Sequence, residues 1–204
     1  MNGEREFKKM KKATIALLLI CGAAFAQQKG SFTDTRDKKT YKTVKIGEQT
    51  WMAENLNYDA EGSKCYGNNP ANCQEYGRLY DWNTALKVCP SGWHLPSRDE
   101  HGVLDNAVGG GNVAGKKLKS SSGWKDDGNG TDEYGFSALP VGNGDLYGRF
   151  DNVGRFGIWW SASEHEYNSS NAYDRTMSCL SNGAGWNDFG YDKSNLFSVR
   201  CLQD

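Results

Sequence analysis

Apolar segments along this chain are short and are separated by polar ones, and this pattern predicts short strands and few long helices. Residues 41–46 and 49–52 are expected to form two strands joined at Gly47-Glu48, because glycine permits the positive φ of a two-residue hairpin turn. Further strand-like segments are 136–139, 157–162, 173–180 and 197–202. In the last segment, Phe197, Val199 and Cys201 alternate onto one face, which is typical of a half-buried terminal strand.

Two amphipathic helices are predicted in the middle of the chain. The first covers residues 80–88 and stops at Cys89-Pro90, because proline excludes the helical conformation at the residue before it. The second begins after Ser97, which forms a reciprocal capping box with Glu100, and it ends at the glycines of 109–111. The fold class is therefore expected to be α+β, with two helices flanking a twisted antiparallel sheet with long loops.

The first 26 residues read as a secretory signal peptide. Four lysines precede an apolar run over 13–23, and Ala24-Phe25-Ala26 provides the small residues of a cleavage site. A lipid anchor on Cys21 is the alternative. No later segment has the roughly 20 apolar residues of a transmembrane helix, so the protein is expected to be secreted or at the cell surface. Residues 27–40 are polar and are assigned to a flexible linker, which leaves 41–204 as one domain.

Charge argues against nucleic acid as a partner. Without the signal peptide, 19 Lys and Arg stand against 23 Asp and Glu, a net charge of −4. Binding to a phosphate backbone depends on neutralising cations, and the only basic cluster, Lys116-Lys117-Lys119, is interpreted as a solvated loop.

Five cysteines follow the signal peptide, and export permits disulfides. Cys65 and Cys73 bracket a polar loop with an Asn-Pro turn, so a local bridge is expected there. Pairing Cys89 with Cys201 would close a loop of more than 100 residues and leave Cys179 free or intermolecular. Zinc is disfavoured because no CxxC pair is present.

Several sequence strings together resemble a known family. They are KTVKIGEQTWMAENLNYDAEGSKCYGNNPANC, YGRLYDWNTALKVCPSGWHLPS, NGTDEYGFSALP, WWSASE and LFSVRCLQD. They resemble the Fibrobacter succinogenes major paralogous domain over residues 32–204. The resemblance implies an exported bacterial domain with a C-type-lectin-like fold, related to formylglycine-generating enzymes. The chain departs from the family pattern at His101, where an aromatic residue usually stands, and at Cys179.

Two motifs are candidates for calcium. Trp186-Asn187-Asp188 matches a run that supplies calcium ligands in sugar-binding lectins, although the partner acid-Pro-Asn loop is missing. Asp127, Asn129, Thr131 and Asp132 carry oxygen groups at short spacing, as calcium loops do. The alternative for both motifs is an ordinary turn in which Asp and Asn bond their own backbone, so a structural calcium is only one of two interpretations.

The segment 167–195 is the best candidate for recognition, because Tyr, Ser, Gly and Asn together give rigid aromatic area with adaptable hydrogen bonding. Its candidate ligand-binding residues are Tyr167, Tyr173, Trp186, Asn187, Asp188 and Tyr191. The leading hypothesis is a non-catalytic module that binds carbohydrate, including plant cell-wall polysaccharide. The alternative is a structural or adhesive surface protein that binds other proteins. A catalytic role is not expected, since hydrolase elbows, zinc-protease helices and phosphate loops are missing from the sequence.

Overall fold

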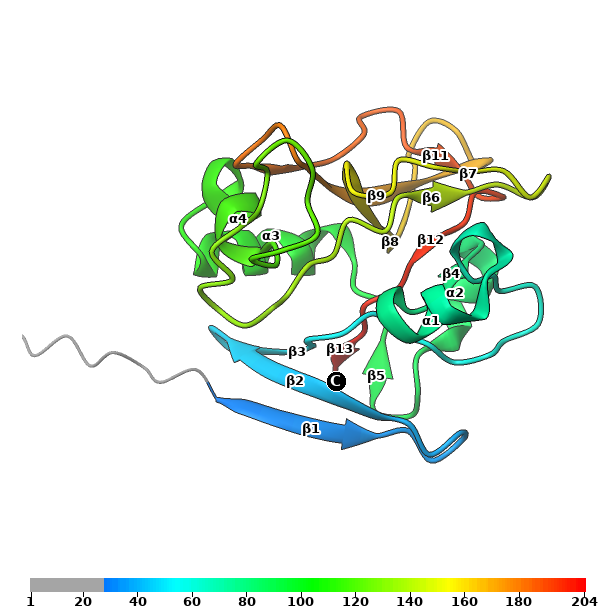
Figure 1. The fold of residues 1–204 in the computed structure, drawn as a ribbon, viewed down its shortest axis with the longest axis horizontal. Coiled ribbons are helices and arrows are strands. Elements are labelled where there is room, and N and C mark those ends of the chain that lie inside the picture. Colours follow the sequence, from blue (N-terminus) through cyan, green and yellow to red (C-terminus); the bar gives the residue numbers. More distant parts are fainter. Residues whose placement is uncertain (1–27) are drawn as a thin grey trace, which may run out of the picture.

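A computed structural model describes residues 28–204 of the chain (Figure 1). The predicted signal peptide, 1–26, lies outside the described residues. Within 28–204 the protein is a mixed α+β structure with four α-helices and mostly antiparallel sheets. The α+β prediction is confirmed at this level.

The first sheet has the strand order β1-β2-β3-β13-β5 and is antiparallel throughout. Its strands are β1 (Lys29–Thr33), β2 (Thr40–Ile46), β3 (Gln49–Met52), β13 (Leu202–Gln203) and β5 (Trp93–His94). The β2–β3 hairpin confirms the predicted one, and Gly47 in its turn has φ 59°. The C-terminal strand therefore lies inside this sheet, between β3 and β5.

The prediction of a flexible linker over 27–40 is wrong for the residues that form β1. This strand pairs with β2 from Lys29↔Val44 to Thr33↔Thr40. It is an edge strand with mostly exposed side chains, so its sequence is polar and lacks the apolar alternation of a half-buried strand. Asp34 and Arg36 in the turn that follows form an ion pair of 2.7 Å.

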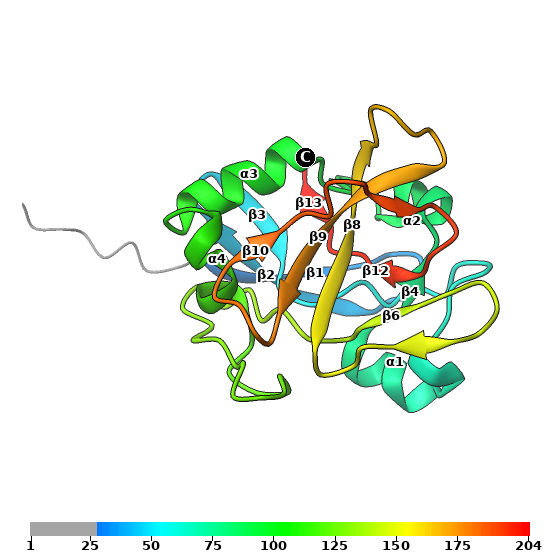
Figure 2. The same ribbon diagram turned by 90° about the horizontal axis from the view of Figure 1, so that it is seen from above.

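The second sheet has the order β10-β9-β8-β12-β4, and β11 also pairs with β9 (Figure 2). Its strands are β10 (Ala184–Gly185), β9 (Asn171–Ser178), β8 (Phe156–Glu164), β12 (Phe197–Ser198), β4 (Leu79–Tyr80) and β11 (Tyr191–Asp192). Only the β12–β8 pair is parallel among the named pairs of the described chain. A small hairpin of β6 (Asn143–Gly144) and β7 (Phe150–Asp151) lies beside it.

The helices number four in residues 28–204, against two predicted. The two predicted helices are α2 (Trp82–Val88) and α3 (Arg98–Ala107), and α3 has the predicted capping box. The two missed helices are α1 (Pro70–Tyr76), which follows a single-turn η1 (Tyr66–Asn68), and α4 (Gly111–Leu118). Both are short and contain glycine, proline or asparagine, so their apolar periodicity is weak.

Three other local predictions need correction. Residues 136–139 form only one isolated bridge, between Ala138 and Lys119. Residues 197–202 split between two sheets and are buried on both faces, with Ser198 and Arg200 as buried as their apolar neighbours. Lys116-Lys117-Lys119 is not a solvated loop, because Lys119 is 1% exposed at the end of α4.

Two large apolar clusters form the core. The first lies around Trp160, Phe197 and α2, and the second joins α3 and α4 to strands β2, β3 and β13 of the first sheet and to Trp159 and Met177 of the second. Both disulfides follow the predicted pairing, Cys65–Cys73 and Cys89–Cys201. Among the described cysteines Cys179 alone is unpaired, and it is buried. Within residues 28–204 no helix is long and apolar enough to cross a membrane.

Candidate functional site

The segment predicted for recognition forms the outer edge of the second sheet. The loop between β8 and β9 projects from the body of the molecule (Figure 2). Beyond β9, β11 pairs at Tyr191↔Ala172 and β10 at Gly185↔Thr176. The loops on either side of these two short strands are therefore held against one long strand.

The four predicted aromatic residues differ sharply in exposure. Tyr167 is 89% exposed, whereas Tyr173 is only 6% exposed. Trp186 and Tyr191 are half-buried. Tyr173 is thus part of the support of this face and not of its accessible surface.

Exposed apolar side chains that were not predicted lie on the same loops. Phe189 is 80% and Leu180 is 81% exposed. The Phe189 carbonyl accepts a hydrogen bond from Asn171 (2.9 Å), and His165 lies 3.0 Å from the Asp188 carbonyl. Residue type alone did not distinguish these side chains from core ones, because the sequence does not give the direction of a loop side chain.

Trp186 packs against two buried or partly buried arginines. The guanidinium carbons of Arg175 and Arg98 lie 5.0 Å and 5.5 Å from its ring centroid, and Arg98 also lies 4.4 Å from Tyr173. Guanidinium groups in this position attract the ring electrostatically. Arg175 in turn forms a buried ion pair with Asp105.

His101 is buried between two tryptophan rings. Its ring lies 5.2 Å from Trp51 and 5.6 Å from Trp186 between centroids. Burial, together with the charge of Arg175, holds its pKa well below the usual value. His101 is therefore neutral at physiological pH, and its ring packs edge-on against that of Trp186.

A hollow opens beside Trp186, which we name the Trp186 hollow; its cavity volume is about 460 Å³. The lining contains no charged side chain; it consists of Gly111, Asn112, Thr176, Ser178, Ser181, Gly183, Ala184, Gly185, Trp186, Asn187 and Tyr191. Two aromatic rings thus stand beside hydroxyl and amide groups and open backbone. This combination can stack on an uncharged ring and bond its hydroxyl groups.

The buried Asp174 carboxylate holds two residues of the Trp186 hollow. It accepts hydrogen bonds from the Thr176 hydroxyl and from the backbone N–H of Asn187 (3.3 Å). Burial raises the pKa of Asp174 to about 6, and the hydrogen bonds from Thr176 and Asn187 offset only part of this effect. The protonation state of a core carboxyl group is therefore coupled to the position of the hollow's lining.

The wall formed by residues 178–184 is held in place by α4. The Lys119 ammonium group donates hydrogen bonds of 2.9 Å to the carbonyls of Ser178 and Ser181. The Lys116 N–H donates to the Asn182 carbonyl (2.7 Å). Such a wall is already ordered before any ligand binds, which lowers the entropy cost of binding.

The Trp186-Asn187-Asp188 motif forms a tight turn. The Asn187 side chain donates to the Gly190 carbonyl (3.1 Å) and accepts from the Phe189 N–H (3.1 Å). Asp188 is exposed. These bonds are those of the ordinary-turn alternative.

The second calcium motif also uses its oxygens locally. Asn129 accepts from the Trp124 N–H (3.0 Å), and Asp132 accepts from the N–H and the hydroxyl of Ser137 (2.7 and 2.6 Å). Asp127 and Thr131 are exposed. Within residues 28–204 no group of three or more His, Cys, Asp or Glu side chains is placed to hold a metal, and calcium binding stays a prediction.

Comparison with known proteins gives one match. A family model described as the Fibrobacter succinogenes major domain matches residues 44–203 of the chain. No curated protein and no solved structure matches it.

Proposed function

Because the chain belongs to the Fibrobacter succinogenes major domain family, we propose that it acts as an exported, non-catalytic recognition module that binds carbohydrate in the Trp186 hollow. The observation that carries this proposal is the lining of the hollow. Trp186 and Tyr191 stand beside Asn112, Thr176 and other uncharged hydrogen-bonding groups. Sugar rings present apolar C–H faces and hydroxyl groups, which are complementary to this lining.

The uncharged lining favours a neutral saccharide over an acidic one. Burial of a charged group against uncharged walls costs free energy unless a counter-charge compensates it. The nearest cations, Arg98 and Arg175, already lie against Trp186, and Arg175 is paired with Asp105. Neutral plant cell-wall polysaccharides such as cellulose and xylan are therefore the first ligands to try.

Export and a lectin-like architecture complete the proposal. Disulfides persist mainly in oxidising compartments, so Cys65–Cys73 and Cys89–Cys201 support an extracellular location. The order of α2 and α3 before a loop-rich sheet, with a disulfide from the end of α2 to the chain's last strands, supports the C-type-lectin-like arrangement.

Retention on insoluble cellulose and xylan tests the proposed function. The wild type and the Trp186→Ala and Asn112→Ala variants are incubated with each polymer, with calcium or with a chelator. We expect the wild type to be retained and both variants to be retained less. Asn112 is exposed and its side chain has no hydrogen bond within the described structure, so its variant separates loss of binding from loss of folding. A wild type that stays in solution under every condition would contradict the proposal.

A second candidate function, adhesion to other proteins, rests on the exposed side chains of the same loops. Tyr167, Leu180 and Phe189 expose apolar area on this edge of the sheet, and exposed aromatic residues are enriched at protein interfaces. Phe189 does not line the Trp186 hollow. Phe189→Ala should therefore weaken adhesion to a protein partner and leave polysaccharide retention unchanged. Trp186→Ala should weaken polysaccharide retention and leave adhesion unchanged.

A further inference from the structure

A second hollow, with a cavity volume of about 790 Å³, lies at the other end of the outer edge of the second sheet that the segment 167–195 forms. We name it the Tyr147 hollow; the residues that matter here are Lys64, Asn68, Asn83, Tyr147, Ser170 and Asp192. Neighbouring residues of β11 line the two hollows, Tyr191 the first and Asp192 the second. In Figure 2, α4 beside the first hollow and the β6–β7 connection beside the second lie on opposite sides of the molecule.

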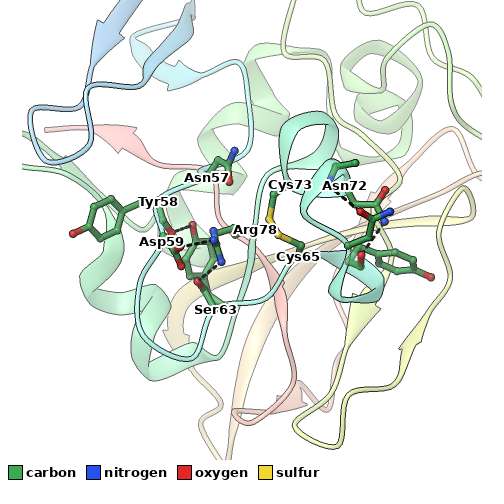
Figure 3. The surroundings of a disulfide bond; sticks show 12 residues. Asn57, Tyr58, Asp59, Ser63, Cys65, Asn72, Cys73 and Arg78 are labelled. Atoms are coloured by element: carbon green, nitrogen blue, oxygen red, sulfur yellow. Dashed lines mark hydrogen bonds and ion pairs between the residues drawn. A yellow bond between two sulfur atoms is a disulfide. The ribbon is translucent and has the colours of Figure 1, made fainter.

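The Cys65–Cys73 disulfide stabilises one wall of the Tyr147 hollow. Asn68 lies within the loop that this disulfide closes. The Asn72 side chain donates to the Tyr66 carbonyl (2.8 Å) in the same loop (Figure 3). The preceding turn is held by Arg78, which contacts Asp59 (2.7 Å) and Ser63 (3.1 Å). This wall is therefore preorganised.

The β6–β7 connection presents the aromatic ring. Tyr147 is 78% exposed at its tip. The Asp145 carboxylate accepts hydrogen bonds from the N–H groups of Tyr147 and Arg149, both 2.9 Å, and fixes the turn. The tyrosine ring is thus held at the rim of the hollow on an ordered turn.

Most charged groups of the lining are satisfied within the protein. Asp145 pairs with Arg149, and Lys193 pairs with Glu164 and lies 4.3 Å from the Trp82 ring centroid. The exposed amides of Asn68 and Asn83, by contrast, make no side-chain hydrogen bond within residues 28–204. Among the residues of 28–204 that line the hollow, the groups left for a ligand are therefore two amides, one aromatic ring and the exposed ammonium group of Lys64.

We propose that the Tyr147 hollow is a second carbohydrate site, in which a sugar ring stacks on Tyr147 while Asn68 and Asn83 bond its hydroxyl groups. The ligand class rests on the proposed function, whereas the position of the site rests on the hollow itself. A monosaccharide fills one hollow only, but a polysaccharide with repeating units can engage both. Two linked contacts raise retention well above that of either contact alone.

Amide chemical-shift mapping tests the second site. The ¹⁵N-labelled protein is titrated with cellotriose and with xylotriose, using the wild type, Tyr147→Ala, Asn83→Ala and Trp186→Ala. Leu86→Ala is the matched control, because Leu86 lies on α2 with Asn83 but lines neither hollow. Tyr147 and Asn83 are exposed, so their variants should keep the wild-type spectrum elsewhere.

The expected result is two separate groups of shifted amides in the wild type. Tyr147→Ala and Asn83→Ala should remove the group around residues 145–148 and 192–194, Trp186→Ala should remove the other, and Leu86→Ala should remove neither. Shifts confined to the Trp186 hollow and unchanged in Tyr147→Ala would overturn the second site and leave the proposed function intact. Shifts confined to the Tyr147 hollow would support the second site and overturn the first. No shifts with either trisaccharide would overturn both.

Discussion

At the scale of single residues, Asp174 couples the pH to the stability of the fold. Its side chain is fully buried, and burial raises its pKa to about 6 from a usual value near 3.8. The folded state therefore favours the protonated form. The stability contributed by this group is full below about pH 4 and is lost as the pH rises through about 6, to the extent of about 2–3 kcal/mol.

Asp174→Asn should remove this loss. Asparagine can still accept from the Asn187 N–H and can donate to the Thr176 hydroxyl, but it does not ionise. We expect the variant to melt at a higher temperature than the wild type at pH 8, with a difference that shrinks as the pH falls to 5. Thermal unfolding followed by circular dichroism at both pH values measures it. A difference that is constant with pH would exclude Asp174 as the titrating group.

Two buried cations show where residue-level prediction fails. Arg200 is 1% exposed and donates to Asn55 Oδ1 (2.8 Å) and to the carbonyl of Phe136. Burial lowers its pKa to about 9. Lys119 was predicted in a solvated loop and instead bonds two carbonyls. The partners of both cations are mostly backbone carbonyls distant in the chain, and a sequence pattern carries no sign of them.

At the scale of elements, apolar patterning predicted the β2–β3 hairpin, α2, α3, β8 and β9. It missed β1 because an exposed edge strand has no apolar face, and it missed α4 because glycines interrupt its pattern. Residue composition singled out the segment 167–195, which supplies most of the lining of the Trp186 hollow, but it did not predict that α4 forms one wall of this hollow. That wall depends on the close packing of α4 against residues 182–184, of which the sequence pattern carries no sign.

Two helical glycines allow a matched test of the close packing of α4 against the 182–184 loop. A Cβ on Gly115 in α4 would lie 2.1 Å from the Gly183 carbonyl oxygen, so Gly115→Ala must displace the wall of the hollow. A Cβ on Gly102 in α3 meets no atom within 4 Å. Alanine usually stabilises a helix interior by about 0.5–1 kcal/mol relative to glycine. We expect that gain for Gly102→Ala and a loss of about 1–3 kcal/mol for Gly115→Ala.

Urea unfolding of both glycine variants measures these free energies. Gly115→Ala should also weaken polysaccharide retention, and Gly102→Ala should leave retention unchanged. A stabilising Gly115→Ala substitution would show that α4 does not pack against the 182–184 loop as described.

At the scale of the whole molecule, the two disulfides differ in the length of chain that they constrain. Cys89–Cys201 has a sequence separation of 112, and Cys65–Cys73 one of 8. In the chain-entropy model, the long loop contributes about 4–5 kcal/mol and the short loop about 2–3 kcal/mol. Replacing both cysteines of each pair by alanine should therefore destabilise the fold more for Cys89–Cys201, as measured by urea unfolding. Equal losses would contradict this assignment.

The short disulfide has a second, local consequence. Because Asn68 lies inside its loop, removal of Cys65–Cys73 should weaken sugar binding in the Tyr147 hollow and leave binding in the Trp186 hollow unchanged. The same amide mapping with trisaccharides distinguishes the two hollows in this variant.

A binding isotherm on insoluble xylan and cellulose measures whether carbohydrate binds against Trp186. We expect saturable binding by the wild type and at least about tenfold weaker binding by Trp186→Ala, equivalent to about 1.4 kcal/mol. Asn112→Ala should also bind more weakly than the wild type. Equal binding by the wild type and both variants, or no binding by the wild type, would contradict it.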